Sequence, residues 1–219
     1  MSKQFVPRTS IAPIHGYWDR PRPKDFGEKD VNNLFRAVGE ALGTWENVEH
    51  IFSRIFGVFV ESTSEAAFRA YGVIASHSGR REALESAAKI YFATRAKEAG
   101  ALDAFNLLVD HLGKASARRN EIAHSTPMTF RVSDTDRGFF SVPAAYNARK
   151  TTAFITHWRD LETKNKDDAY AVFGLSYRYT ADDIMHFVSR FQLLQQQATE
   201  LLVYLIQLHT FERTGQRAP

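Results

Sequence analysis

Residues 31–59, VNNLFRAVGEALGTWENVEHIFSRIFGVF, decide the fold class. Their apolar side chains recur every three or four positions, which is the spacing of one face of an α-helix. The apolar stripe consists of Val31, Leu34, Val38, Ala41, Trp45, Val48, Phe52, Ile55 and Phe59. This pattern predicts a long amphipathic helix. Gly43 followed by Thr44 marks a point at which the helix could bend or divide.

Three further helical segments are predicted before residue 125. Ser62 and Glu65 have the spacing of a capping box and predict the start of a second helix, which continues to a break at residues 77–79. A third helix is expected over about 80–97 and a fourth over about 102–124. Arg80 and Arg81 begin the third helix, where the helix dipole disfavours cations, and they indicate a nearby carboxylate or anion. A solvated loop is the simpler explanation of these two arginines.

The stretch 126–179 has a different pattern of apolar residues from the helical segments before it. MTFRVS, a turn at residues 134–138 and FFSVP alternate in the manner of a short hairpin. Residues 144–168 are polar and predict an exposed loop, and residues 170–179 predict a third strand. Thr180 and Asp183 then have capping-box spacing and predict the start of the last helix. Its apolar residues keep a seven-residue repeat that predicts packing along another long helix: Ile184, Phe187, Phe191, Leu194, Ala198, Leu201, Leu205 and Leu208.

Together these elements predict a mainly α fold, an up-and-down helical bundle with a small antiparallel β insertion between the last two long helices. We expect a single domain over 29–212 that includes the insertion at 126–179. An irregular, proline-containing basic arm over 1–28 precedes it, and a tail over 213–219 follows it. We interpret the arm as a solvated tail, with contact to nucleic acid or to a partner as the alternative. Its positive charges are Arg8, Arg20, Arg22 and Lys24.

Composition narrows the possible functions only a little. The chain has 219 residues with 28 Lys and Arg against 25 Asp and Glu, and the net charge of +3 is too small to indicate nucleic-acid binding. The chain contains no cysteine, which excludes disulfides, thiolate zinc sites and a cysteine nucleophile, and which fits a cytoplasmic protein. No apolar run has the length of a signal peptide core or a transmembrane helix, so we expect neither export nor a membrane partner.

The sharpest anomaly lies at the end of the fourth helix, where residues 118–127 read RRNEIAHSTP. The apolar stripe of this helix runs through Ala101, Phe105, Leu108, Leu112 and Ala115, then reaches Arg119 and continues to Ile122. A charge in a packing seam is costly unless it is paired or used. Arg119 therefore indicates a carboxylate, an interface or an anionic ligand. Arg118 is the weaker candidate, because we expect it to reach solvent more easily.

Two polar residues accompany Arg119. Asn120 and His124 are four positions apart and share one helix face, where the amide can bond a ring nitrogen and fix the tautomer. Arg119 and His124 are about 140° apart on an ideal helix, so they converge only through the length of the arginine or across a symmetric interface. This geometry favours a homodimer. Pro127 biases Thr126 away from helical dihedrals, so His124 is expected in or just beyond the last turn.

These residue types suit one chemistry. An arginine that holds a phosphate and a histidine that moves protons suffice for metal-free phosphodiester cleavage, in which a ribose 2′-OH attacks the adjacent phosphorus. The alternative is a helix-end arginine paired with a core carboxylate and a histidine that caps the helix. Glu49 and Glu46 are candidates for that carboxylate, or else ordinary flanking charges. Because the histidines lack metal-ligand spacing, we expect no metal and no cofactor.

The Arg-Asn-x-x-Ala-His string at the end of a long helix resembles the R-x4-6-H motif of HEPN domains. The resemblance implies a helical bundle that commonly dimerises, and many members are metal-independent ribonucleases of toxin–antitoxin, abortive-infection and CRISPR-associated systems. It maps Arg119 and His124 onto the catalytic pair and Asn120 onto the polar residue after the arginine. The arm and the insertion at 126–179 depart from a minimal HEPN bundle.

The resemblance yields two functional hypotheses. The first is a metal-independent endoribonuclease, a toxin or phage-defence component that acts on RNA as a homodimer, with an antitoxin as a possible partner. Arg119, Asn120 and His124 would form its catalytic site, and Arg118 and Glu49 are possible supporting residues. The second hypothesis is a catalytically silent HEPN-like module for dimerisation or for binding a ligand or a nucleic acid.

Overall fold

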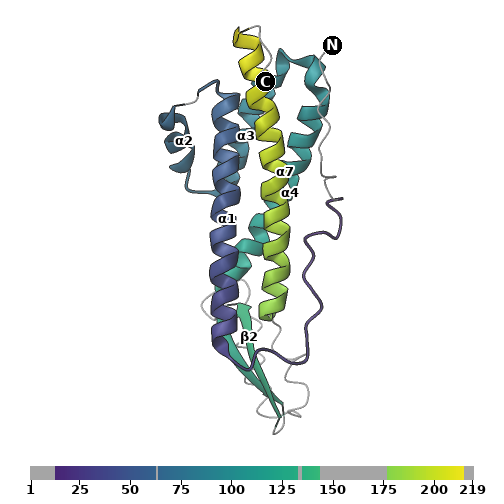
Figure 1. Cartoon of the computed structure of the whole chain (residues 1–219). Helices are drawn as coiled ribbons and strands as arrows, with labels where there is room; N and C mark the ends of the chain where they lie inside the picture. The colour runs from purple at the N-terminus through teal and green to yellow at the C-terminus, as the bar shows by residue number, and fades with distance from the viewer. Residues whose placement is uncertain (1–12, 63, 133–134, 144–176, 215–219) are drawn as a thin grey trace. The chain divides into compact units, whose positions relative to one another are not determined.

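The computed structural model describes residues 13–62, 64–132, 135–143 and 177–214. In these residues the fold is mainly helical, with one two-stranded antiparallel sheet between the last two long helices, which confirms the predicted fold class (Figure 1). The elements in chain order are α1 (Val31–Phe59), α2 (Glu65–Gly72), α3 (His77–Ala93), a 3-10 turn (Ala96–Glu98), α4 (Ala99–Ala123), β1 (Ser125–Val132), β2 (Thr135–Pro143) and α7 (Ala181–Thr214). None of the described helices combines the length and the apolar character that a membrane span requires.

The chain divides into two compact units. The first unit consists of Met1–Trp18, Thr44–Ser116 and Arg190–Pro219. The second unit consists of Asp19–Gly43 and Ala117–Ser189. The helices α1, α4 and α7 each contribute residues to both units. The expectation of one domain over 29–212 stays a prediction.

Aromatic side chains fill the core of the first unit. Phe59 of α1 packs edge-on against Phe105 of α4, with ring centroids 4.9 Å apart, and also contacts Tyr91 and Phe92 of α3. In the same unit Trp45 of α1 packs against Phe191 of α7 at 5.5 Å, where the two helices run side by side in Figure 1. Such pairs contribute about 0.5–1.5 kcal/mol each beyond the area they bury. The helical stripes read from the sequence therefore face a common core.

The arm contributes to the same core. Trp18 is only 4% exposed, its Nε1 donates a hydrogen bond of 2.9 Å to Nδ1 of His111, and its ring stacks on Phe191. A buried indole with a satisfied N–H anchors the chain here, so the interpretation of the arm as a solvated tail is wrong for this segment. Residues 1–12 of the arm lie outside the described part of the chain.

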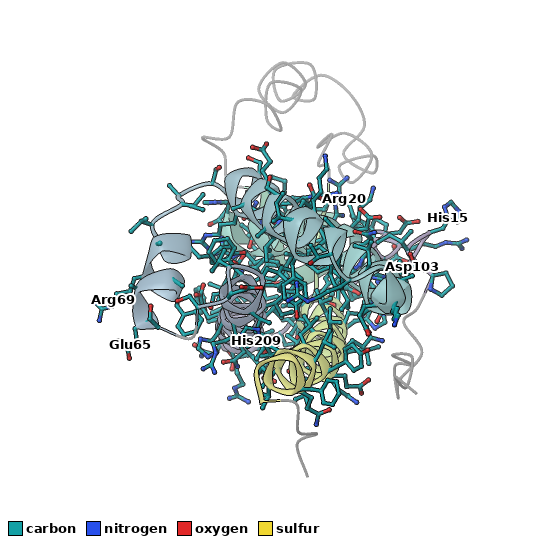
Figure 2. The ribbon with its side chains drawn as sticks, turned by 90° about the horizontal axis from the view of Figure 1, so that it is seen from above. His15, Arg20, Glu65, Arg69, Asp103 and His209 are labelled. Carbon is teal, nitrogen blue, oxygen red and sulfur yellow. The ribbon has the colours of Figure 1, made fainter. Side chains whose placement is uncertain are left out.

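The two shorter helices start at positions other than those predicted. The N-cap of α2 is Ser64 rather than Ser62. The break predicted at residues 77–79 is wrong, because the side chain of Ser76 accepts a bond from the backbone of Gly79 and starts α3 at His77. Glu65 and Arg69, an exposed i,i+4 pair of α2, lie together on its outer side (Figure 2).

The hairpin of β1 and β2 belongs to the second unit. Phe130 pairs with Gly138 while Arg131 pairs with Asp136, so a bulge falls at this point of β2. Gly138 has φ +83°, and a Cβ at this position would lie 2.6 Å from the carbonyl oxygen of Glu28. The turn predicted at 134–138 is therefore wrong for residues 135–138, which lie in β2, because the glycine serves the bulge.

Two short backbone pairings extend the hairpin. Glu28 and Phe139 exchange two backbone hydrogen bonds of 2.8 Å. Ser141 and Tyr179 exchange two more, of 2.8 and 2.9 Å. The Tyr179 pairing agrees with the third strand predicted over 170–179 at the end of that range, and residues 170–176 lie outside the described residues. These pairings cover backbone groups that an edge strand would otherwise leave open.

The capping box predicted at the start of α7 is confirmed. The backbone N–H of Thr180 donates to Oδ2 of Asp183 at 2.9 Å, and the N–H of Asp183 donates to Oγ1 of Thr180 at 3.3 Å. Lys24 of the arm also reaches this cap, because its Nζ lies 3.1 Å from Oγ1 of Thr180. The seven-residue repeat is buried from the first turn onward, at Ile184, Phe187, Phe191, Leu194, Ala198, Leu201 and Leu205.

We predict that Thr180→Ala lowers the free energy of unfolding by about 1 kcal/mol, because the cap loses the side-chain acceptor of an otherwise unpaired N–H. Thr199→Ala is the matched control, since the Thr199 hydroxyl bonds only the carbonyl of Gln195 within the same helix. Its effect should stay within about 0.5 kcal/mol. Urea unfolding of both variants measures the difference. Equal effects would contradict the capping role.

Candidate functional site

Side chains from two other segments cap the end of α4. The last carbonyls of a helix have no partner within it. Here the backbone N–H of His124 donates to the carbonyl of Asn120 at 3.1 Å. The Tyr177 hydroxyl donates to the carbonyl of Glu121 at 2.8 Å, and the Ser125 hydroxyl donates to that of Ile122 at 2.8 Å. The turn that carries the RNEIAH string is therefore fixed by three donors.

Glu121 is the buried charge of this helix end, and it is 3% exposed. Nη2 of Arg20 lies 2.6 Å from its Oε1, and Nη1 of Arg118 lies 3.1 Å from its Oε2. The Tyr179 hydroxyl donates to Oε2 at 2.5 Å. Two guanidinium groups and a phenol thus surround one carboxylate, which is the condition under which a buried carboxylate is tolerated.

The same contacts shift two pKa values. Burial and the hydrogen bond to Glu121 raise the pKa of Tyr179, so its hydroxyl stays protonated and keeps donating. The hydrogen bond to Glu121 also raises the pKa of Arg20. The Glu121 carboxylate is held by three donors of the protein itself.

Sequence reasoning missed this cluster. Glu121 stood inside the motif without a role, and Arg20 was assigned to a solvated arm. One signal was available, since Arg118 and Glu121 are three positions apart and such pairs meet on a helix surface. The expectation that Arg118 reaches solvent is wrong, because its side chain is 15% exposed and paired.

Arg119 is half-buried at the end of the apolar stripe. The other stripe residues are buried as predicted: Ala101, Phe105, Leu108, Leu112, Ala115 and Ile122. Nη1 of Arg119 donates to Oδ1 of its neighbour Asn120 at 3.2 Å. The amide predicted to orient His124 thus holds the guanidinium in this structure.

Asn120 and His124 are both exposed. The backbone bond between them continues the helical spacing, so both lie toward solvent on the outer side of the last turn. In the described part of the chain, the His124 imidazole makes no hydrogen bond and no ion pair. The structure therefore brings Arg119 and Asn120 into contact and leaves the imidazole open to a partner molecule.

Glu49, the other predicted supporting residue, belongs to the first unit. Its Oε2 lies 3.1 Å from Nη1 of Arg80, and its Oε1 lies 3.6 Å from Nδ1 of His77. A carboxylate beside Arg80 is thereby confirmed, and the solvated-loop explanation is wrong. Arg81 likewise pairs with Glu85 and Asp110. A role of Glu49 toward Arg119 stays a prediction.

Comparisons with known proteins add no assignment: no family model matches the chain, and none of the curated proteins or solved structures compared with it is significantly similar. Among the described residues, no group of three or more histidine or carboxylate side chains is placed to hold a metal ion.

We predict that Glu121→Gln lowers the free energy of unfolding by about 3 kcal/mol, because it leaves the charge of Arg118 buried without its counterion. Glu85→Gln, which removes the exposed partner of Arg81, is the matched control and should cost less than about 1 kcal/mol. Denaturant unfolding at neutral pH compares the two variants. Equal losses would show that the Glu121 cluster is no stronger than a surface ion pair.

The contacts of Glu49 with His77 and Arg80 lead us to expect that the stability of the protein depends on pH. Burial opposes the ionisation of Glu49, but the contacts with His77 and Arg80 outweigh burial and lower its pKa below the ordinary 4.5. A lowered folded-state pKa stabilises the protein above pH 4.5, and this contribution is lost as the pH falls through the folded value.

The stability difference between the wild type and Glu49→Gln should accordingly be largest near neutral pH and shrink toward pH 3. Urea unfolding across this range measures it. Glu40→Gln, an exposed change on the same helix, is the control and should show no such trend. A difference that does not depend on pH would contradict the ion-pair explanation.

Proposed function

We propose that this protein is a metal-independent endoribonuclease of HEPN type that cleaves RNA by attack of the ribose 2′-OH on the adjacent phosphorus. The observation that carries the proposal is the arrangement of the last turn of α4. Its buried carboxylate, Glu121, is held by three donors, while Asn120 and His124 are exposed and Asn120 contacts Arg119. The turn presents a cation, an amide and an imidazole to a ligand.

Each side chain has a defined role in this reaction. His124 takes the proton from the 2′-OH or gives one to the leaving 5′-oxygen, since an exposed imidazole can do either. Arg119 stabilises the negative charge that develops on the phosphorus oxygens. Asn120 holds the guanidinium through the bond of 3.2 Å. The products are a 2′,3′-cyclic phosphate and a 5′-hydroxyl, and no metal takes part.

A homodimer completes the site in this proposal. Arg119 and His124 are about 140° apart around the helix axis, so one helix end does not direct both groups at a single phosphate. In a two-fold dimer, the arginine of one copy meets the histidine of the other. A cytoplasmic toxin or phage-defence role, controlled by an antitoxin, would suit such an enzyme.

We predict that the purified protein cleaves RNA in EDTA and leaves DNA of the same sequence intact, because DNA has no 2′-OH. His124→Ala should lower the rate about 100-fold or more, since general acid–base catalysis contributes that much. Arg119→Ala should lower it by about 10²–10³. His50→Ala and Arg36→Ala, exposed residues of α1, are the matched controls and should retain wild-type rates.

End-group analysis of the products by mass spectrometry checks the chemistry. Equal activity in His124→Ala, or loss of activity in EDTA, would contradict the assignment. RNA binding without cleavage by the wild type would favour the silent binding module instead.

Mixing the two inactive variants tests the shared site. Half of the randomly formed dimers are mixed, and one of their two sites combines an intact arginine with an intact histidine. The mixture should therefore recover about a quarter of wild-type activity. No recovery after subunit exchange would place both groups of each site in one chain.

A further inference from the structure

Tyr177, at the end of the β insertion, contacts the helix end that precedes His124. α4 ends at Ala123, and His124 follows as the last residue whose N–H donates into the helix, at 3.1 Å to Asn120. A residue at this position moves if the final turn opens, whereas Arg119 lies one turn earlier and does not.

Tyr177, which lies outside α4 and β1, bonds a backbone carbonyl of this turn. Its hydroxyl donates to the carbonyl of Glu121 at 2.8 Å. The Tyr177 ring is 4% exposed and stacks on Tyr179 with centroids 4.8 Å apart. A buried, stacked ring holds its hydroxyl in one place, so the bond is a fixed restraint on the turn.

We propose that Tyr177 is a positioning residue: through the carbonyl of Glu121 it holds the last turn of α4 closed and so places His124 for catalysis. This inference rests on the proposed ribonuclease function for its kinetic consequence. The hydroxyl touches no reacting atom. It acts on the proton-transfer step and leaves the binding of RNA by Arg119 unchanged.

Tyr177→Phe tests the proposal, because it removes the hydroxyl and keeps the stacked ring. Tyr71→Phe is the matched control. Tyr71 is 2% exposed, and its hydroxyl has no hydrogen-bond partner among the described residues, so the same chemical change there removes no bond. Both variants are compared with the wild type by amide hydrogen exchange and by RNA cleavage kinetics.

In Tyr177→Phe, exchange of the His124 amide should be about fivefold faster, because the turn opens more often without its cap. The kcat should fall about tenfold while KM stays within about twofold, since misplacement of a catalytic group affects the chemical step. Tyr71→Phe should change none of these quantities. Ser125→Ala, which removes the neighbouring bond to Ile122, should shift exchange and kcat in the same direction as Tyr177→Phe.

Several results would overturn the proposal. Wild-type exchange at His124 in Tyr177→Phe would show that the bond does not hold the turn. Faster exchange with an unchanged kcat, a rise in KM alone, or equal effects of Tyr71→Phe would each show that the hydroxyl has no positioning role. A Tyr177→Phe protein that does not fold would show that the hydroxyl supports the whole unit rather than one turn. If the wild type cleaves no RNA, the proposed function fails, while the exchange comparison still decides whether Tyr177 holds the turn.

Discussion

The second unit depends on the ion pairs and the hydrogen bond that the buried carboxylate of Glu121 makes. A buried carboxylate is tolerated only when donors replace the water it has lost, and here they come from three separate segments. Arg20 belongs to the arm, Arg118 to the same helix, and Tyr179 to the residues before α7. The Glu121 carboxylate thereby joins parts of the chain that are distant in sequence. Arg20 lies about 100 positions before it and Tyr179 lies 58 positions after it. Apolar contacts at the same place would not specify these three partners.

The helical period divides the RNEIAH string between buried and exposed residues. Glu121 and Ile122 face inward and are buried, while Asn120 and His124 face outward. Successive residues on a helix differ by about 100°, so residues that are close together in a motif can lie in different environments. The inward residues fix the turn and the outward ones remain open to a ligand. In this string, the residues that fix the turn therefore alternate with the residues that the turn exposes.

Local patterns in the sequence were sufficient for the two longest helices, α1 and α7, and for their starts. The stripe of α1 and the repeat of α7 depend on spacing alone, and the box at Thr180 and Asp183 lies within four residues. The starts of α2 and α3 were missed because several serines stand close together, and spacing does not decide which one caps. Arg119 was identified through a break in a periodic stripe, which is again a local signal.

What could not be read from the sequence is the pairing of distant charges. Nothing in the local pattern distinguishes Arg20, which binds Glu121, from Arg22, which is exposed two residues later. The carboxylate itself was assigned no role, because the stripe drew attention to Arg119 on the other side of the helix. Long-range ion pairs follow from the fold as a whole, and single positions carry little trace of them.

The arm and the insertion are therefore part of the machinery at the end of α4 rather than additions to it. Arg20 neutralises the Glu121 side chain and Tyr179 donates a hydrogen bond to it, while Tyr177 holds its backbone carbonyl. Both additions also pair with β2, through Glu28 and Tyr179. Because β1 begins two residues after α4 ends, the hairpin joins these contacts back to the same turn. A bundle without the arm and the insertion would have to satisfy the buried carboxylate and the Glu121 carbonyl by other means, so the geometry at the end of α4 depends on both additions.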